Sequence, residues 1–105
     1  MQKQAIYAYS LSGKNIRVSI VSARLRMVLD PKGIIGVDTL DPLTDFFDGA
    51  NPAFVLPDMI SSYKPFHDDK LEVTVGDISK AKTVHDVTTI ILRKYKQMGW
   101  KVLIG

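Results

Sequence analysis

The chain contains no cysteine among its 105 residues. This absence excludes a disulfide framework, a thiolate metal site and a cysteine nucleophile. Long apolar runs are also missing, because none approaches the ~20 residues that a membrane-spanning helix needs, and no signal-peptide pattern opens the chain. Together these absences predict a cytoplasmic protein that does not associate with membranes.

Gly-rich phosphate loops and nucleophile elbows are missing as well. The acidic residues from Asp38 to Asp48 lack the alternating ligand spacing and the terminal Glu of a calcium loop. The run His67-Asp68-Asp69 comes nearest to a metal or acid–base site, but the sequence offers no second ligand set at a closing distance. We interpret this run as a solvated loop, and expect neither catalysis nor a bound metal.

Length and composition set the domain organisation. With 46% hydrophobic and 24% charged residues, the chain is long enough to bury a core as one domain. We predict a single domain over residues 1–105. Within it, residues 1–14 are an N-terminal extension, residues 15–98 a helical core and residues 99–105 a C-terminal extension.

The net charge of +3 hides a segregation of charge along the chain. Residues 1–35 carry six Lys or Arg and one Asp, and residues 78–105 repeat that balance. Residues 36–77 instead carry two Lys and nine Asp or Glu. Because a field of one sign steers a partner of the opposite sign, the acidic middle predicts a protein partner with a basic surface.

The basic C-terminal part has two interpretations. Phosphate contacts come chiefly from Lys and Arg, so Arg93, Lys94, Lys96 and Lys101, interleaved with two aromatic residues, form a candidate nucleic-acid surface. Against this, helical spacing assigns Tyr95 to a core, and the acidic middle repels a polyanion. We favour a solvated helix face and no nucleic-acid binding.

The strongest local signal lies in the stretch Asp41–Ala53. Asn51 is suited to cap a helix, because its side chain accepts a hydrogen bond from an unpaired backbone N–H of the first turn. Pro52 is suited to the first helical position, since it has no N–H to leave unpaired. The pair Asn51-Pro52 therefore predicts the start of a helix.

This run and the apolar helix after it resemble the modification site and second helix of acyl carrier proteins, whose pattern is Leu-Gly-(small)-Asp-Ser-Leu. Gly49 and Ala50 stand at the Gly and small positions, and Asn51 at the Asp. Pro52 stands where the family has the serine that carries phosphopantetheine, and Ala53 at the following Leu. Because proline has no hydroxyl, the resemblance implies a carrier-like domain without phosphopantetheine at the usual position and without another cofactor.

A second resemblance precedes the last predicted helix. Leu71–Val75 is similar to the short apolar stretch that leads into the short third helix of carriers, and Thr83-Val84-His85-Asp86 is close to their Thr-Val entry into the last helix. Thr83 and Asp86 also form a capping box. Apolar residues at spacings of three and four then predict an amphipathic helix to about Met98.

The resemblance implies a mainly α fold, an acyl-carrier-like four-helix bundle with a long first loop. That loop spans residues 30–48, and we expect Phe46 and Phe47 to fold inward. The segment before it is ambiguous: period-two alternation predicts a hairpin over residues 6–21, whereas spacings of three and four predict a helix from about Asn15 to Leu29. We favour the helix, because the carrier fold needs a first helix that ends well before the modification position.

Apolar segments at both termini extend beyond the carrier fold. Trp100–Ile104 is expected to form a strand. We expect residues 5–10 to pair with it in a small sheet, since an unpaired exposed strand invites aggregation.

The second predicted helix contains an internal proline, Pro57. Because an interior proline costs about 3 kcal/mol, we expect either a kink or a later start near Leu56. Pro65 is expected to end the helix. The predicted buried stripe consists of Phe54, Val55, Met59, Ile60 and Tyr63.

The resemblance implies a non-catalytic docking or structural module in fatty acid, polyketide or peptide biosynthesis. Carriers typically present an acidic second helix to basic patches on their enzymes. One alternative is a working carrier modified at another hydroxyl, although Ser61 and Ser62 lie roughly 14 Å along the helix from its start. Another is an unrelated small α/β domain that binds nucleic acid. The expected docking residues are Asp48, Phe54, Asp58 and Met59.

Overall fold

The structure, a computed structural model, describes residues 13–105. Over this range the chain forms five α-helices, one 3-10 helix and two short strands, which confirms the prediction of a mainly α chain. The longer helices are α2 (Val18–Leu29), α3 (Pro52–Ser62) and α6 (Val84–Gln97). The shorter elements are β1 (Asn15–Arg17), η1 (Leu43–Phe46), α4 (Lys64–Asp68), α5 (Val75–Ile78) and β2 (Lys101–Leu103).

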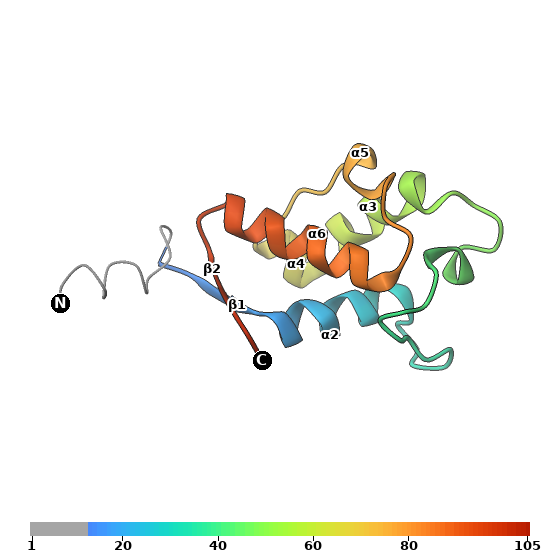
Figure 1. Ribbon diagram of the computed structural model, residues 1–105, viewed down its shortest axis with the longest axis horizontal. Coiled ribbons are helices and arrows are strands. Elements are labelled where there is room, and N and C mark those ends of the chain that lie inside the picture. Colours follow the sequence, from blue (N-terminus) through green and yellow to red (C-terminus); the bar gives the residue numbers. More distant parts are fainter. Residues whose placement is uncertain (1–12) are drawn as a thin grey trace.

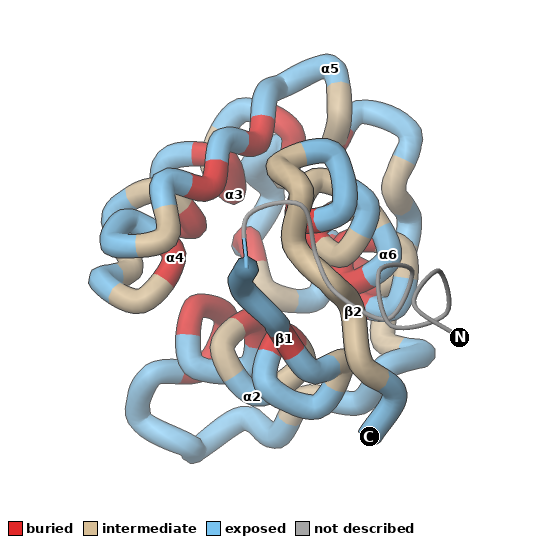
Figure 2. The backbone as a smooth tube through the Cα atoms, turned by 90° about the vertical axis from the view of Figure 1, so that its left-hand side faces the viewer, coloured by how far each residue is buried: buried red, intermediate tan, exposed pale blue. Residues whose placement is uncertain are grey.

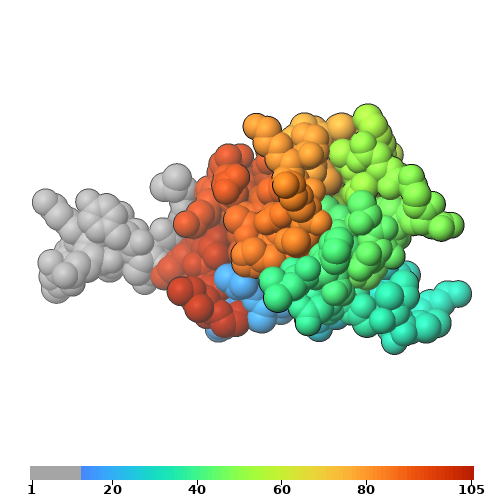
Figure 3. All heavy atoms as spheres, turned by 45° about the vertical axis from the view of Figure 1, so that its right-hand side comes forward, coloured from blue at the N-terminus to red at the C-terminus, as the bar shows by residue number. Residues whose placement is uncertain are grey.

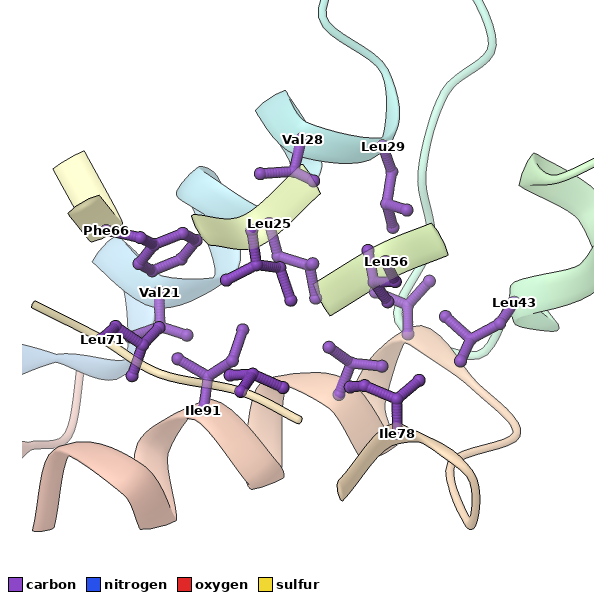
Figure 4. Packing of buried hydrophobic residues seen from close by; sticks show 14 of the residues in the cluster. Val21, Leu25, Val28, Leu29, Leu43, Leu56, Phe66, Leu71, Ile78 and Ile91 are labelled. Atoms are coloured by element: carbon purple, nitrogen blue, oxygen red, sulfur yellow. The ribbon is translucent and has the colours of Figure 1, made fainter. Parts of the chain in front are cut away.

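One hydrophobic core joins the three longer helices (Figure 1, Figure 4). Each contributes fully buried side chains, among them Leu25 of α2, Leu56 of α3 and Ile91 of α6. Helices of 12, 11 and 14 residues are marginal in isolation, where ~12–15 residues are needed for stability. Burying a Leu or Ile side chain contributes about 1.5–3 kcal/mol, so the shared core stabilises the helices.

The first helix begins later than predicted. Residues 15–17 form strand β1, which pairs in parallel with β2, so Asn15 does not cap a helix. Residues 18–21 belong to α2, so they do not form the second strand of the alternative hairpin over residues 6–21. Helix α2 starts at Val18 without a side-chain cap. Instead, the backbone N–H of Ser19 donates to the carbonyl oxygen of Gly105 at 3.0 Å. The C-terminal end of α2 lies where the sequence predicts it.

The predicted C-terminal strand is confirmed as β2. Figure 2 shows β1 and β2 side by side, where they lie at the end of the molecule that faces the viewer. The expected partner, residues 5–10, lies outside the described residues. Trp100, just before β2, packs edge-on against Tyr95, with 4.9 Å between the ring centroids. This contact joins the small sheet to the end of α6.

The long first loop is present between α2 and α3, interrupted only by η1. Leu43 and Phe47 are buried, and Phe46 packs partly buried against the core, so the expected inward folding of the two phenylalanines is confirmed. The backbone N–H of Leu43 donates to the carbonyl oxygen of Lys82 at 2.9 Å. The loop is therefore fastened to the segment that leads into α6.

Pro57 and Pro65 do not have the effects on α3 that the sequence predicts. Helix α3 begins at Pro52 and runs without interruption through Pro57, so the later start near Leu56 is wrong. Pro57 itself is buried, and it leaves one hydrogen bond of the helix unformed because it has no N–H. Pro65 does not end α3, because Tyr63 already separates α3 from α4. Pro65 lies in the first turn of α4, where no intrahelical partner for its nitrogen is needed.

The buried stripe of α3 also differs from the prediction. Ala53, Leu56, Pro57 and Ile60 are buried, and Val55, Met59 and Tyr63 pack partly buried against the core. Phe54 is 68% exposed, so its assignment to the stripe is wrong.

The last helix follows the sequence closely. Thr83 accepts a hydrogen bond from the Asp86 N–H and the Asp86 side chain accepts one from the Thr83 N–H, which confirms the capping box. A second box, formed by Thr74 and Asp77, begins the short helix α5. Each box satisfies backbone donors at a helix start and fixes where that helix begins.

Candidate docking site at the start of helix α3

The start of α3 has the geometry that the Asn51-Pro52 pair predicts. The N–H of Ala53 donates to Asn51 Oδ1 at 3.0 Å, and Pro52 is the first helical residue. The chain enters this cap through a tight turn in which Asp48 has a φ of 39° and Gly49 a φ of 87°. Asp and Gly are among the residues that tolerate positive φ, so this sequence permits the turn.

A cavity of about 370 Å³ opens beside Pro52. It lies between η1, the start of α3 and the turn after α5, with Leu43 and Ile78 among its apolar residues. Two hydroxyl side chains, Thr44 and Ser79, and the cation of Lys82 also line it. The first turns of α3, from Pro52 to Met59, contain no residue with a side-chain hydroxyl.

Thr44 and Ser79 are hydroxyl residues that sequence reasoning missed. Thr44 precedes Pro52 by eight residues and Ser79 follows it by 27, and the packing of η1 and α5 brings both to the same cavity. The hydroxyl of Ser79 donates to the carbonyl oxygen of Gly76 at 2.9 Å. The hydroxyls that the sequence suggested, Ser61 and Ser62, lie at the opposite end of α3.

The expected docking residues do not all reach the surface equally. Phe54 and Asp58 are exposed, and their spacing of four places them on one face of α3. Asp48 is exposed in the turn before the helix. Met59 is partly buried against the core and offers less of its side chain. Figure 3 shows the long loop and the start of α3 protruding at the end of the molecule opposite to β1 and β2.

Three carboxylates lie exposed near this helix start. Asp45, Asp48 and Asp58 are exposed and form no ion pair with any other residue in the range 13–105. An exposed aromatic ring accompanied by unpaired carboxylates is suited to a partner surface that carries apolar and basic groups.

Two carboxylates elsewhere, Asp77 and Asp86, have partners within the fold. Asp77 Oδ2 lies 3.0 Å from Lys94 Nζ. The hydrogen bond from the Thr74 backbone, opposed in part by burial and aided by Lys94, lowers the pKa of Asp77. For Asp86, the backbone hydrogen bonds from Lys82 and Thr83 lower the pKa in the same way. The carboxylates of Asp77 and Asp86 therefore stabilise helix starts within the fold.

The run His67-Asp68-Asp69 is not the solvated loop that the sequence suggested, because His67 and Asp68 lie in α4 and Asp69 is partly buried. Asp68 pairs with Lys64 at 2.9 Å, and this hydrogen bond lowers the pKa of Asp68. Asp69 instead pairs with Arg24 at 2.7 Å, so the two carboxylates serve different partners. Among residues 13–105, no group of three or more His, Asp or Glu side chains is placed to hold a metal ion.

The basic C-terminal part presents few aromatic faces for base stacking. Tyr95 is fully buried, and Trp100 is partly buried with Lys14 Nζ 5.4 Å from its ring centroid. Lys94 is already paired with Asp77. The exposed basic side chains Arg93 and Lys96 therefore lie on a helix face without accessible rings between them.

In the part of the chain that the structure describes, no helix is both long and apolar enough to cross a membrane. Comparisons of the chain with protein-family models, with curated proteins and with solved structures each give no match. The functional assignment therefore depends on the geometry above and on the motif resemblance.

Proposed function

We propose that the chain is an acyl-carrier-like docking module that carries no phosphopantetheine and acts beside enzymes of fatty acid, polyketide or peptide biosynthesis. The observation that carries the proposal is the start of α3, where Asn51 caps the helix and Pro52 occupies the first helical position. This is the position at which the resemblance requires a nucleophilic hydroxyl. Proline keeps the helix start and removes the nucleophile.

The order of elements supports a carrier-like four-helix bundle. Helix α2, a long loop, α3, a short α5 and α6 follow one another as the resemblance implies. The inward-folded Phe47 and the capping box at Thr83 fit the same arrangement. Helix α4 and the pair β1–β2 are additions to it. We therefore place the proposed bundle in α2, α3, α5 and α6.

The proposed docking surface consists of Asp48, Phe54 and Asp58, with Met59 at its edge. Phe54 is 68% exposed and offers apolar area that is unused within residues 13–105. The two carboxylates add attraction for a basic partner without being needed for an ion pair in the described fold. The expected partner is a protein with an apolar pocket surrounded by Lys or Arg.

The test introduces a serine at position 52, where the resemblance requires one. The natural chain, the double variant Asn51→Asp/Pro52→Ser and the control Pro52→Ala are incubated with coenzyme A and a permissive phosphopantetheinyl transferase, and their intact masses are measured. We expect one added arm on the double variant and none on the other two proteins. An unmodified double variant that remains folded would contradict the carrier-like assignment of this helix start.

A second candidate function is a working carrier that uses a different hydroxyl. It is favoured by Thr44 and Ser79, which line the same cavity as Pro52. In the same experiment this candidate predicts an added arm on the natural chain. Thr44→Ala or Ser79→Ala would then abolish the modification, whereas Ser61→Ala would leave it unchanged.

A further inference from the structure

A second cavity lies at the opposite end of the molecule, and the proposed docking function does not use it. It measures about 470 Å³ and is bounded by β1, α2 and the segment from Trp100 to β2. Ile16, Ile20, Trp100 and Leu103 supply apolar walls. Its charged lining residues are Arg17, Arg24 and Asp69. The volume falls within the range of about 300–1,000 Å³ that is typical of small-molecule sites.

Arg24 is held in a fixed position at this cavity. Its Nη1 donates to Asp69 Oδ2 at 2.7 Å and to the Tyr95 hydroxyl at 3.1 Å. Tyr95 in turn donates to Asp69 Oδ2 at 2.8 Å, and the guanidinium lies 5.5 Å from the ring centroid of Phe66. These contacts come from α4, α6 and the turn after α4, so the fold itself orients the guanidinium.

The same guanidinium keeps donors for a ligand. A guanidinium carries five N–H groups, and both side-chain bonds of Arg24 within the described residues use Nη1 alone. Nε and Nη2 therefore donate to no described residue. A positioned group with spare donors loses little conformational entropy when it binds an anion.

Arg17 makes the cavity net positive. Arg24 balances the single carboxylate, Asp69, whereas the exposed Arg17 forms no ion pair with any residue of the described range. Ile20 is 42% exposed at the same cavity, so an apolar wall lies next to the cations. Guanidinium groups match the planar geometry of carboxylates, and the apolar walls match an aliphatic or aromatic body.

We propose that this cavity binds a small organic carboxylate with an apolar body. The carboxylate lies between Arg17 and Arg24, and the body packs against Ile16, Ile20 and Trp100. No bond is made or broken in this interaction, which is reversible. The site is independent of the start of α3, so it stands or falls separately from the docking function.

The probe is 3-phenylpropionate, titrated into the isotopically labelled full chain and followed by NMR. We expect saturable shifts at the Trp100 indole N–H and at Ile16, Ile20 and Leu103, with a dissociation constant on the order of 1 mM for a ligand of this size. The alcohol 3-phenylpropanol and the amine 3-phenylpropylamine are expected to bind at least about tenfold more weakly, because each lacks the carboxylate.

Two variants and a control test the role of the arginines. Arg17→Gln removes an exposed charge, and Arg24→Lys keeps the charge while removing the planar fork; each is expected to weaken binding about tenfold. Arg93→Gln, which removes an exposed charge on α6 outside the cavity, is expected to bind as the natural chain does. Circular dichroism melting shows whether each variant is folded.

Several outcomes would overturn the proposal. They are the absence of saturable shifts, equal binding of the alcohol, shifts centred on the cavity beside Pro52, or folded Arg17→Gln and Arg24→Lys proteins that bind like Arg93→Gln. Loss of binding in a folded Arg17→Gln protein supports the site even where Arg24→Lys does not fold, because the Arg17 side chain forms no ion pair within the described residues.

Discussion

The two ends of the molecule handle charged and aromatic side chains in opposite ways. At the start of α3, Asp48 and Asp58 have no cation partner within residues 13–105, and Phe54 is 68% exposed. At the β1–β2 end, one carboxylate, Asp69, accepts from both Arg24 and Tyr95. The second arrangement is a connected network of the kind that fixes a unique packing. The first arrangement contains no ion pair that would stabilise the described fold, which is why we propose it as a docking surface.

Tyr95 is the fully buried member of this network, and its hydroxyl group has a shifted pKa. Burial raises the pKa of Tyr95, and the hydrogen bond to the Asp69 carboxylate raises it further. Arg24 opposes these effects only in part. We therefore expect the network of Arg24, Asp69 and Tyr95 to stabilise the fold and the exposed side chains at the start of α3 to contribute little stability. Both expectations can be measured.

The largest expected difference in the free energy of unfolding is between substitutions of two phenylalanines, Phe66 and Phe54. Phe66 is fully buried, packs edge-on against Tyr63 and lies beside Arg24, so Phe66→Ala should lower the free energy of unfolding by about 3–5 kcal/mol. Phe54→Ala is the matched control and should change it by less than about 0.5 kcal/mol. Urea denaturation measures both. A large loss of stability in Phe54→Ala would show that this ring supports the fold and would contradict its proposed role in docking.

Removal of one hydroxyl from the network should have an intermediate effect. Tyr95→Phe leaves Arg24 and Asp69 paired but deletes the hydroxyl that both contact, and should cost about 1–2 kcal/mol of unfolding free energy. Tyr63→Phe is the control, because no side-chain hydrogen bond of Tyr63 lies within the described fold, and it should remain within about 0.5 kcal/mol. Equal effects of the two substitutions would show that the network adds no stability.

The raised pKa of Tyr95 predicts a loss of stability at high pH. Above about pH 10 a tyrosine in the unfolded chain releases its proton, whereas buried Tyr95 keeps it. The native state then binds more protons than the unfolded state, so the free energy of unfolding falls as pH rises, by up to about 1.4 kcal/mol per pH unit. Below that pH the contribution is fully present.

The variant Tyr95→Phe supplies the control for this pH dependence. It lacks the titrating hydroxyl, so the stability difference between it and the natural chain should shrink as the pH rises above about 10. Denaturation curves of both proteins at neutral and alkaline pH measure the difference. A constant difference across this range would contradict a raised pKa for Tyr95.

The sequence predicted those elements whose determinants are neighbours in the chain. The Asn51 cap acts on a residue two positions away, and the Thr83–Asp86 box spans three positions. Both could therefore be located from residue type and spacing alone. The inward folding of Phe47 was also predictable, because a long loop rich in apolar residues has to bury some of them.

The features that the sequence did not reveal depend on distant partners. Strand β1 fits a helical spacing equally well, and its identity is decided by β2 at the other end of the chain. Arg24 meets Asp69 and Tyr95 across separations of 45 and 71 residues. The exposure of Phe54 likewise follows from which face of α3 the other elements cover. No local pattern carries that information.

The smallest expected effect on the free energy of unfolding comes from substitution of the exposed carboxylates near the start of α3. Asp48 is exposed and has a φ of 39°, a conformation that Asn tolerates as well as Asp does. Asp48→Asn should therefore change the free energy of unfolding by less than about 0.5 kcal/mol, and Asp58→Asn should do the same because its carboxylate forms no ion pair within residues 13–105. Urea denaturation of each variant beside the natural chain gives the measurement. If either substitution destabilised the protein by more than about 1 kcal/mol, the carboxylate would have a structural role, and the contrast between the two ends would no longer separate recognition from stability.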